Sequence, residues 1–351
     1  MHRSIASRVA DIVSSRTREL GGKAYLERPH EPWVLSAEAF QPIPSSSARL
    51  DAGDLSSPIA SVAYIDGGNA ELLASSIFSL SRIQVAGAIF RGRECLGRVT
   101  ESFYCLASIE SGQQKMDVDI IGTGLLSPFS IAADEQCLTD GVFKARIGRT
   151  GELVRRMAEL TMMHKLAAAD ASRDGGSKTS GPASGPPVDV VVRDGTLQMQ
   201  SAPERAIGLP PNAAALTKTS GLLTDSGAPL SALARSLAPQ ATWHVPAASL
   251  QYPGVKATMH LVCLSDRSRR IFRLETLAGL SEALPISDLC ISLAQNATDP
   301  VFLGYPFGLI EANRLARIED PQREAERLRL LQPRITEALQ DRDAHDVLDA
   351  L

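Results

Sequence analysis

The sequence lacks the residue patterns that mark several common classes of protein. Its five cysteines are scattered, with no Cys-x-x-Cys pair and no cluster of cysteine with histidine, so they indicate neither a zinc site nor a disulfide framework. This usage is typical of a reducing compartment, and we expect a cytoplasmic protein. No apolar run reaches 18 residues, and the N-terminus has no long apolar segment. We therefore expect neither membrane insertion nor secretion.

An excess of charge of one sign is also missing. The chain has 36 Lys and Arg against 40 Asp and Glu, a net charge of −4. A nucleic-acid partner would then have to be held by a local basic surface rather than by the global charge. The length of 351 residues allows a sizeable core and predicts one large domain or two smaller ones.

The first half of the chain predicts a helix, a connector and a set of strands. Residues 2–20 have a helical apolar pattern, and the Pro/Ser-rich stretch 42–58 reads as a connector. Extended runs then follow at 62–65, 76–90, 102–109 and 116–121. Because short polar turns join these runs, they predict an antiparallel meander. A helix over about 151–169 follows them.

The second half predicts an insertion, two strands and a helical end. Residues 170–187 have almost no apolar side chains, which predicts a disordered insertion within a domain. Strands are expected at 256–265 and 270–277, and helices at 286–297, 309–318 and from 321 onward. We therefore expect an N-terminal helix and connector over 1–57, a main domain over 58–320 and a C-terminal helical tail over 321–351.

Two apolar runs each end in Asp-Gly, and they are the most informative feature of the chain. The first reads Val62-Ala-Tyr-Ile-Asp66-Gly67-Gly68, and the second reads Val190-Val-Val-Arg-Asp194-Gly-Thr-Leu. We expect each aspartate to lie at the tip of a buried strand. The second run is continuously apolar before its arginine, which suits a strand covered on both faces.

Two other interpretations compete with a pair of functional aspartates. Asp-Gly-Thr-Leu after a strand also ends the haloacid-dehalogenase phosphatase motif, but that chemistry needs an aspartate where this chain has Val192. Asp-Gly is also the favoured centre of a type I′ hairpin, so each run could be only a turn. For either run alone, a hairpin turn explains the pattern as well as a functional aspartate does, because short motifs are weak signals.

The helix between the two runs offers a third carboxylate. Glu152 and Glu159 are seven residues apart and share one helix face, with Arg155 and Arg156 between them. A solvated face with ion pairs is the plain interpretation. We favour Glu159 as the inward residue because its neighbours are apolar. Three carboxylates on rigid elements would suit Mg²⁺ or Mn²⁺ and phosphodiester hydrolysis.

Six motifs occur in an order that resembles the NurA nuclease family, the DNA-end-processing partner of the HerA translocase. They are Tyr64-Ile-Asp66-Gly-Gly, Arg155-Arg-Met-Ala-Glu159-Leu, Val191-Val-Arg-Asp194-Gly-Thr-Leu, Lys218-Thr-Ser, Ile271-Phe-Arg273-Leu-Glu275 and Gly304-Tyr305-Pro-Phe-Gly-Leu-Ile-Glu311-Ala-Asn313-Arg-Leu-Ala-Arg. The resemblance covers about residues 60–318.

This resemblance implies an α/β fold with an RNase H-like mixed sheet flanked by helices, and additional helices at both ends of the chain. It implies a Mn²⁺-dependent single-strand endonuclease and 5′-to-3′ exonuclease acting on DNA, and Mg²⁺ is the alternative cofactor. It also implies a homodimer and a hexameric HerA-type ATPase partner, in end resection, double-strand break repair or foreign-DNA processing. The implied metal ligands are Asp66, Glu159 and Asp194, and Tyr305 and Asn313 lie beside them as catalytic-site residues.

Asn313 departs from the family pattern, because many members have a histidine there. An asparagine can coordinate a metal through its carbonyl oxygen but cannot act as a general acid or base. Activity would then be weaker, or Glu311 or Asp320 would contribute, and the sequence does not choose between them. The first motif reads Asp-Gly-Gly where the family usually has Asp-Gly-Ser, which should leave the ligand intact.

Two basic residues are weaker candidates for substrate contacts. Lys218 would contact a phosphate or be an exposed loop lysine. Arg273, between two apolar residues of a strand, would be held inward by a carboxylate or would face DNA. We interpret His164, His244 and His260 as structural, because they have no mutual metal spacing. The alternative function is a catalytically silent clamp that encircles DNA and regulates its ATPase partner, and Asn313 is the residue that favours it.

Overall fold

The computed structural model describes residues 7–8, 22–26, 30–44, 60–75, 77–109, 115–132, 135–139, 147–168, 187–218, 221–239, 242–268 and 270–331. The helix expected over 2–20, the connector over 42–58, the insertion over 170–187 and the last twenty residues of the tail lie wholly or largely outside these ranges. The domain boundaries predicted at 57/58 and 320/321 stay predictions.

The chain divides into two compact units, and each is described here by itself. The β3 unit contains Ser61–Arg193, Gln198–Ala213 and Gly308–Leu351. The β10 unit contains Met1–Ala60, Asp194–Leu197 and Ala214–Phe307. Asp66 and Glu159 therefore belong to the β3 unit, and Asp194 belongs to the β10 unit.

The β3 unit is built on an antiparallel meander with one parallel strand at its side. The meander runs through β3 (Ser61–Ala74), β4 (Phe78–Arg91), β5 (Glu94–Ile109), β6 (Lys115–Ile121) and β7 (Phe129–Ala132), each paired with the next. β8 (Val190–Asp194) pairs with the other edge of β3, in parallel, with Val62 opposite Val190 and Ile65 opposite Arg193. The predicted meander is confirmed.

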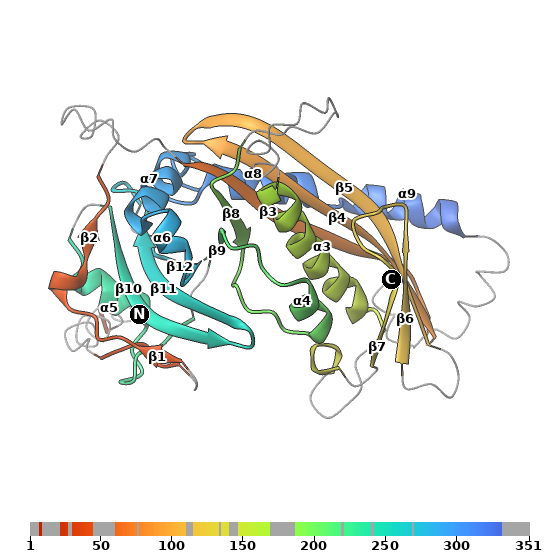
Figure 1. The fold of residues 1–351 in the computed structure, drawn as a ribbon, viewed down its shortest axis with the longest axis horizontal. Helices are drawn as coiled ribbons and strands as arrows, with labels where there is room; N and C mark the ends of the chain where they lie inside the picture. Colours follow the sequence, from red (N-terminus) through yellow and green to blue (C-terminus); the bar gives the residue numbers. More distant parts are fainter. Residues whose placement is uncertain are drawn as a thin grey trace. The chain divides into compact units, whose positions relative to one another are not determined.

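Helices cover both faces of this sheet. The long helix α3 (Arg149–Ala168) packs on β3, β4 and β5, and the short helix α4 (Ala202–Ile207) packs against α3. In Figure 1, α3 lies in front of these strands, whereas α8 (Phe307–Ala316) and α9 (Asp320–Leu330) lie behind them. A short 3-10 helix, η2 (Gln136–Leu138), contacts α3.

The order of elements in the β3 unit explains the predicted fold class. Three antiparallel strands, a helix and then a fourth strand parallel to the first form the RNase H-like arrangement that the motifs implied. A right-handed crossover through a helix is the usual connection between two parallel strands of one sheet. The α/β class with a mostly antiparallel mixed sheet flanked by helices is confirmed.

Glycines allow α3 and α8 to approach β3 closely. A Cβ atom at Gly67 would lie 2.7 Å from the Glu159 Oε1 atom of α3, and one at Gly68 would overlap the Ala316 carbonyl oxygen of α8. Because neighbouring residues of a strand face opposite sides of the sheet, the two glycines serve the two helix layers separately. The Gly-Gly pair is thus required for packing.

The β10 unit has its own antiparallel strands in the order β1, β10, β11, β12 and β9, and β2 also pairs with β10. Their bounds are Glu31–Pro32 (β1), Gln41–Pro42 (β2), Ala213–Thr217 (β9), Trp243–Tyr252 (β10), Val255–Cys263 (β11) and Phe272–Leu277 (β12). The helices are η1 (Ala37–Ala39), α5 (Leu230–Leu237), α6 (Leu280–Ala283) and α7 (Ile286–Asn296). Within the described ranges, no helix combines the length and apolar character that crossing a membrane requires.

Candidate functional site

Asp66 lies in the middle of a strand and not at its tip, so this part of the sequence prediction was wrong. β3 continues through Asp66, Gly67 and Gly68 to Ala74 and stays paired with β4 over this stretch. The parallel pairing with β8, however, ends at Ile65 and Arg193. The hairpin interpretation of the first Asp-Gly is also wrong, because the chain does not turn there.

Two hydrogen bonds orient the Asp66 carboxylate. Its Oδ1 atom accepts a bond from the backbone N–H of Gly67 at 2.8 Å, and its Oδ2 atom accepts one from Asn313 Nδ2 at 2.7 Å. Asn313 comes from α8, 247 residues away in the chain. The side chain of Asp66 is largely buried, with 7% exposed. Asn313 therefore orients Asp66 and, as an amide, cannot exchange a proton with it.

Glu159 points into the β3 unit, whereas Glu152 is exposed on the same helix. Glu159 is 2% exposed. Its Oε2 atom accepts a bond from Arg193 Nη2 at 3.1 Å, and its Oε1 atom pairs with Arg155. Burial raises the pKa of Glu159, the two arginines oppose that rise, and the Asp66 charge adds to it. The charge of Asp66 therefore disfavours the ionised form of Glu159.

Arg193 is a member of this cluster that sequence reasoning missed. It is buried, and within the described residues its Nε and Nη1 atoms have no hydrogen-bond partner. The available signal was a charged residue that directly follows three valines in a strand covered on both faces. A buried arginine needs a carboxylate partner, and Glu159 of α3 provides it.

Asp194 ends β8, and its surroundings are described within the β10 unit. Lys218 Nζ lies 2.5 Å from Asp194 Oδ2, and the Tyr305 hydroxyl donates to Asp194 Oδ1 at 3.3 Å. Lys218 also lies 5.5 Å from the centre of the Tyr305 ring. Gly195 has a φ of +104°, which favours glycine, and the chain leaves the strand there. The second Asp-Gly therefore ends a parallel strand and does not form the hairpin that we considered.

A buried carboxylate, Glu275, fixes the turn after Asp194. Its Oε2 atom accepts a bond from the Leu197 backbone N–H at 2.8 Å, and its Oε1 atom accepts one from the Tyr252 hydroxyl at 3.2 Å. Arg273 Nη2 lies 2.5 Å from Glu275 Oε1 and donates to Tyr252 at 2.9 Å. Of the two environments expected for Arg273, the structure has the inward one, held by a carboxylate.

Glu311 and Asp320 were the alternatives to Asn313 as proton-transfer groups. Glu311 accepts bonds from Arg98 and Arg314, and these arginines, Arg314 first, lower its pKa to about 2. A carboxylate with so low a pKa is a poor general base near neutral pH. Asp320 is exposed and pairs with Arg323 at 3.6 Å. Neither Glu311 nor Asp320 is therefore placed to act as the proton-transfer group that a histidine at position 313 would provide.

The donors in the β3 unit suit a hard divalent cation. Asp66 and Glu159 have carboxylate oxygens, the ligand type that Mg²⁺ and Mn²⁺ prefer, whereas Asn313 turns its amide N–H toward Asp66. A cation would relieve the repulsion between the two carboxylates, but it would compete with Arg155 and Arg193 for Glu159. Among the described residues, no group of three or more His, Cys, Asp or Glu side chains is placed to hold a metal.

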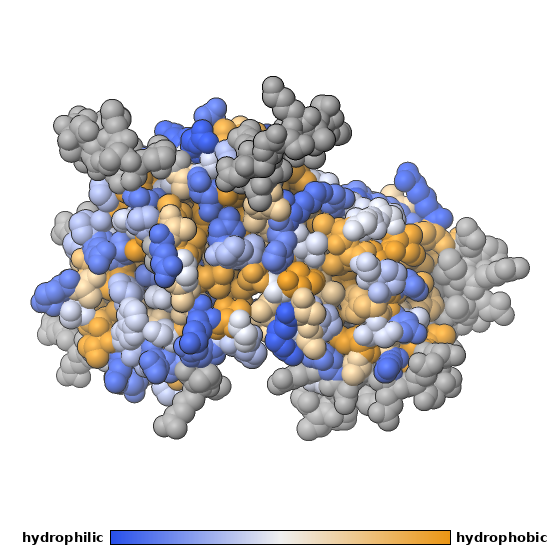
Figure 2. All heavy atoms as spheres, viewed as in Figure 1, coloured by the Kyte–Doolittle hydropathy of each residue, from blue (hydrophilic) through white to orange (hydrophobic). Residues whose placement is uncertain are grey.

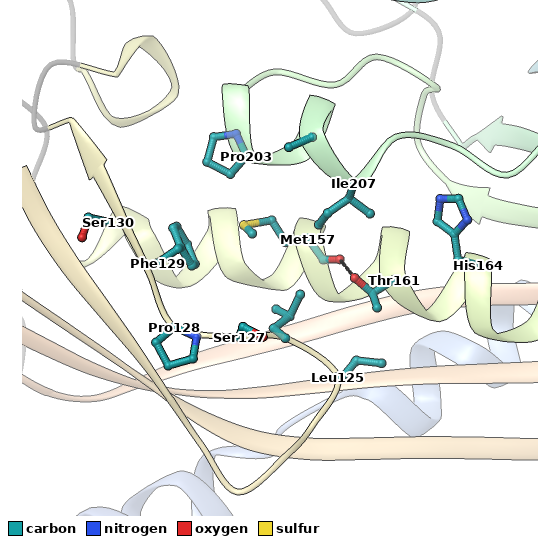
Figure 3. Close-up of a pocket in the computed structure, with 12 residues that line it drawn as sticks. Leu125, Ser127, Pro128, Phe129, Ser130, Met157, Thr161, His164, Pro203 and Ile207 are labelled. Carbon is teal, nitrogen blue, oxygen red and sulfur yellow. Dashed lines mark hydrogen bonds between the residues drawn. The ribbon is translucent and has the colours of Figure 1, made fainter.

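An apolar cavity of about 640 Å³ lies elsewhere in the β3 unit. Figure 3 shows Met157, Thr161 and His164 of α3 facing Pro203 and Ile207 of α4. The segment 125–130 before and within β7 closes the other side. Figure 2 shows hydrophobic surface over this part of the chain. Because its lining contains no carboxylate, the cavity is not part of the candidate metal site.

His244 and His260 form a buried pair in the β10 unit. Their ring centres are 6.3 Å apart on β10 and β11. Burial lowers the pKa of both residues. For His260, burial and then the charge of His244 lower the pKa to about 4. Both rings are therefore neutral in the folded protein near pH 7.

We expect the protein to lose stability as the pH falls from about 6.5 toward 4. An unfolded histidine titrates at about 6.5, so in this window the unfolded chain binds more protons than the folded chain. The stabilisation by the neutral rings is complete above pH 6.5 and decreases below it. Urea unfolding across this range measures the loss. His260→Gln should show a smaller loss than the wild type, and equal losses in the two proteins would contradict this assignment.

Comparison with known proteins finds similarity only at the level of structure. No protein-family profile and no curated protein sequence matches the chain. The chain is similar to the NurA nuclease from Sulfolobus solfataricus, with 12% identity, 81% of this chain and 86% of that one covered, and a TM-score of 0.46. A second NurA structure has 9% identity, 96% and 99% coverage and a TM-score of 0.46.

Human endonuclease V is similar over 76% of this chain and 86% of its own, with 12% identity and a TM-score of 0.33. At these identities and TM-scores, the roles of individual side chains rest on the geometry described above. The fold of this chain is thus similar to that of solved NurA structures over most of both chains.

Proposed function

We propose that this protein is a metal-dependent nuclease that hydrolyses phosphodiester bonds in DNA. The observation that carries the proposal is that Asp66 and Glu159, buried carboxylates of a strand and a helix of the β3 unit, interact electrostatically with each other. Asp66, Glu159 and Asp194 are the proposed metal ligands, and the metal is Mn²⁺ or Mg²⁺. When bound, such a metal lowers the pKa of an attacking water and stabilises charge on the phosphate.

The other residues of the two clusters have supporting roles in this proposal. Asn313 orients Asp66 through its amide, and Arg193 stabilises the charge of the buried Glu159. Tyr305 and Lys218 hold Asp194, and Lys218 is also a proposed phosphate contact. Arg155 has to release Glu159, at least in part, for the carboxylate to bind a metal.

The finer parts of the proposal are supported by the order of motifs in the sequence. They are single-strand endonuclease and 5′-to-3′ exonuclease activity, a homodimer, and action with a HerA-type hexameric ATPase in DNA end resection. The second candidate is a silent clamp that encircles DNA and regulates that ATPase. Asn313 favours it, since an amide cannot move a proton, and so do the arginines already paired with Glu159.

Purified protein, labelled single-stranded DNA and Mn²⁺ separate the two candidates. A nuclease should cut with Mn²⁺, stop cutting with EDTA and lose its activity in Asp194→Ala. Mn²⁺ should also raise the midpoint of thermal unfolding. At a free Mn²⁺ concentration a hundred times the dissociation constant, the free energy of unfolding should increase by about 2.7 kcal/mol. A clamp should bind DNA equally with and without Mn²⁺ and cut none. Cleavage by Asp194→Ala at the wild-type rate would exclude Asp194 as a catalytic ligand.

A further inference from the structure

Two arginines of the β3 unit share one buried carboxylate. Arg314 Nε and Nη2 each lie 2.9 Å from a carboxylate oxygen of Glu311, and Arg98 Nε donates to Glu311 Oε1 at 2.8 Å. The Glu311 side chain is 5% exposed, whereas those of Arg98 and Arg314 are 50% and 67% exposed. The carboxylate is therefore covered, and both guanidinium groups face solvent.

This cluster carries excess positive charge with unused donors. Two guanidinium groups against one carboxylate leave a net charge of +1. Within the part of the chain that the structure describes, Arg98 bonds to Glu311 through Nε alone, so its two Nη groups remain as donors for a ligand. Guanidinium groups whose direction is already fixed lose little freedom on binding, and they match the geometry of phosphate oxygens.

The arginines lie on the same side of the sheet as Asp66. Arg98 of β5 is opposite Ala88 of β4, which is opposite Tyr64 of β3, and Asp66 is two residues farther along that strand. On α8, Arg314 directly follows Asn313, whose amide donates to Asp66. The cluster is thus joined to the candidate metal ligand through adjacent residues of one helix.

We propose that Arg98 and Arg314 form a phosphate-binding pair that holds the backbone of a nucleic-acid strand next to Asp66. The proposal deepens the nuclease function and rests on it for the choice of ligand. A strand offers phosphates at regular intervals, so two cations held at one carboxylate can contact neighbouring phosphates. Backbone contacts of this kind fix the position of a strand without reading its sequence.

The test is DNA binding in EDTA, where no cleavage occurs. Fluorescence anisotropy with a single-stranded oligonucleotide gives the affinity between about 50 and 200 mM salt. Each lost phosphate contact should reduce the slope of log K against log salt by about 0.7. Arg98→Gln and Arg314→Gln should each show that reduction and bind several-fold more weakly. Arg323→Gln is the matched control, because Arg323 is also exposed and paired with an aspartate.

A second variant separates binding from folding. A single arginine substitution leaves Glu311 with one partner, but the triple variant Arg98→Gln/Glu311→Gln/Arg314→Gln removes the buried charge together with both cations. It should keep the far-UV circular dichroism spectrum and lose both contacts. A folded triple variant with the wild-type salt slope would overturn the proposal and leave the arginines a structural role.

Two further outcomes separate this proposal from the nuclease function and from a free-phosphate site. Reduced slopes in the arginine variants of a protein that never cuts DNA would support the arginine pair and refute the nuclease. Inorganic phosphate, at matched ionic strength, should compete only weakly with the oligonucleotide. Equal competition per phosphate group would identify a free-phosphate site and overturn the assignment to a strand.

Discussion

If the proposed nuclease function holds, replacing Asp66 with asparagine is expected to reduce Mn²⁺-dependent cleavage of DNA by at least about a hundredfold, the loss that even outer-shell changes at metal sites can cause. Asp66 contributes a carboxylate whose two oxygens are oriented by Gly67 and Asn313. Asparagine keeps the shape and one acceptor oxygen but removes the charge that attracts the cation. Initial rates of cleavage over a Mn²⁺ titration measure both the loss and any shift in metal affinity.

The control for this experiment is Glu152→Gln. Glu152 is a carboxylate on α3, seven residues from Glu159, and it is exposed. Removing its charge should change the cleavage rate by less than about twofold, since isolated surface charges contribute little. If Asp66→Asn cuts like the wild type while its thermal unfolding is unchanged, Asp66 is not a metal ligand.

Replacing Gly308 with alanine is expected to destabilise the protein by about 3 kcal/mol, at the upper end of ordinary overpacking costs. A Cβ atom there would lie within 2.5 Å of three ring atoms of Tyr64, which is fully buried. Either the ring or the first turn of α8 must move. Because α8 carries Asn313, the displacement should also weaken the contact with Asp66. Urea unfolding measures the stability, and DNA cleavage reports on the site.

The predicted destabilisation by Gly308→Ala is opposite to the usual effect of this substitution in a helix. Alanine in a helix is normally more favourable than glycine by about 1 kcal/mol, so a substitution judged from the sequence alone would stabilise α8. Gly124→Ala is the control, because a Cβ atom there has nothing within 4 Å, and its effect should stay within about 0.5 kcal/mol. A stabilised Gly308→Ala variant would mean that α8 does not pack on Tyr64 as described.

The comparison of Glu152 with Glu159 shows how far a local pattern reaches. The two residues share a helix face by spacing, and the apolar neighbours of Glu159 were enough to favour it as the inward one. The structure places Glu159 inside and Glu152 outside. Periodicity cannot identify the partner, however. The spacing along α3 places Arg155 one turn from Glu159, but it gives no sign of Arg193, which bonds to Glu159 from strand β8.

For Asp66, the sequence identified the residue but predicted its position in the strand wrongly, because Asp66 lies within β3 and not at its end. An Asp-Gly after an apolar run reads locally as the end of a strand, because glycine and aspartate are poor strand residues. The strand continues because β4 pairs with it and because two helices need the space that Gly67 and Gly68 leave. That need arises only when α3 and α8 pack.

By itself, the sequence indicated the meander, the helix that carries Glu159 and the two aspartates of the Asp-Gly runs, but it missed α4, β9, α5 and β10. The features that it indicated depend on side-chain periodicity and turn chemistry, which act over a few residues. Tertiary structure decided that Asn313 orients Asp66 across 247 residues and that Arg98 meets Glu311 across 213. Hydrogen bonds and ion pairs form wherever packing brings their partners together, and no local pattern records that distance.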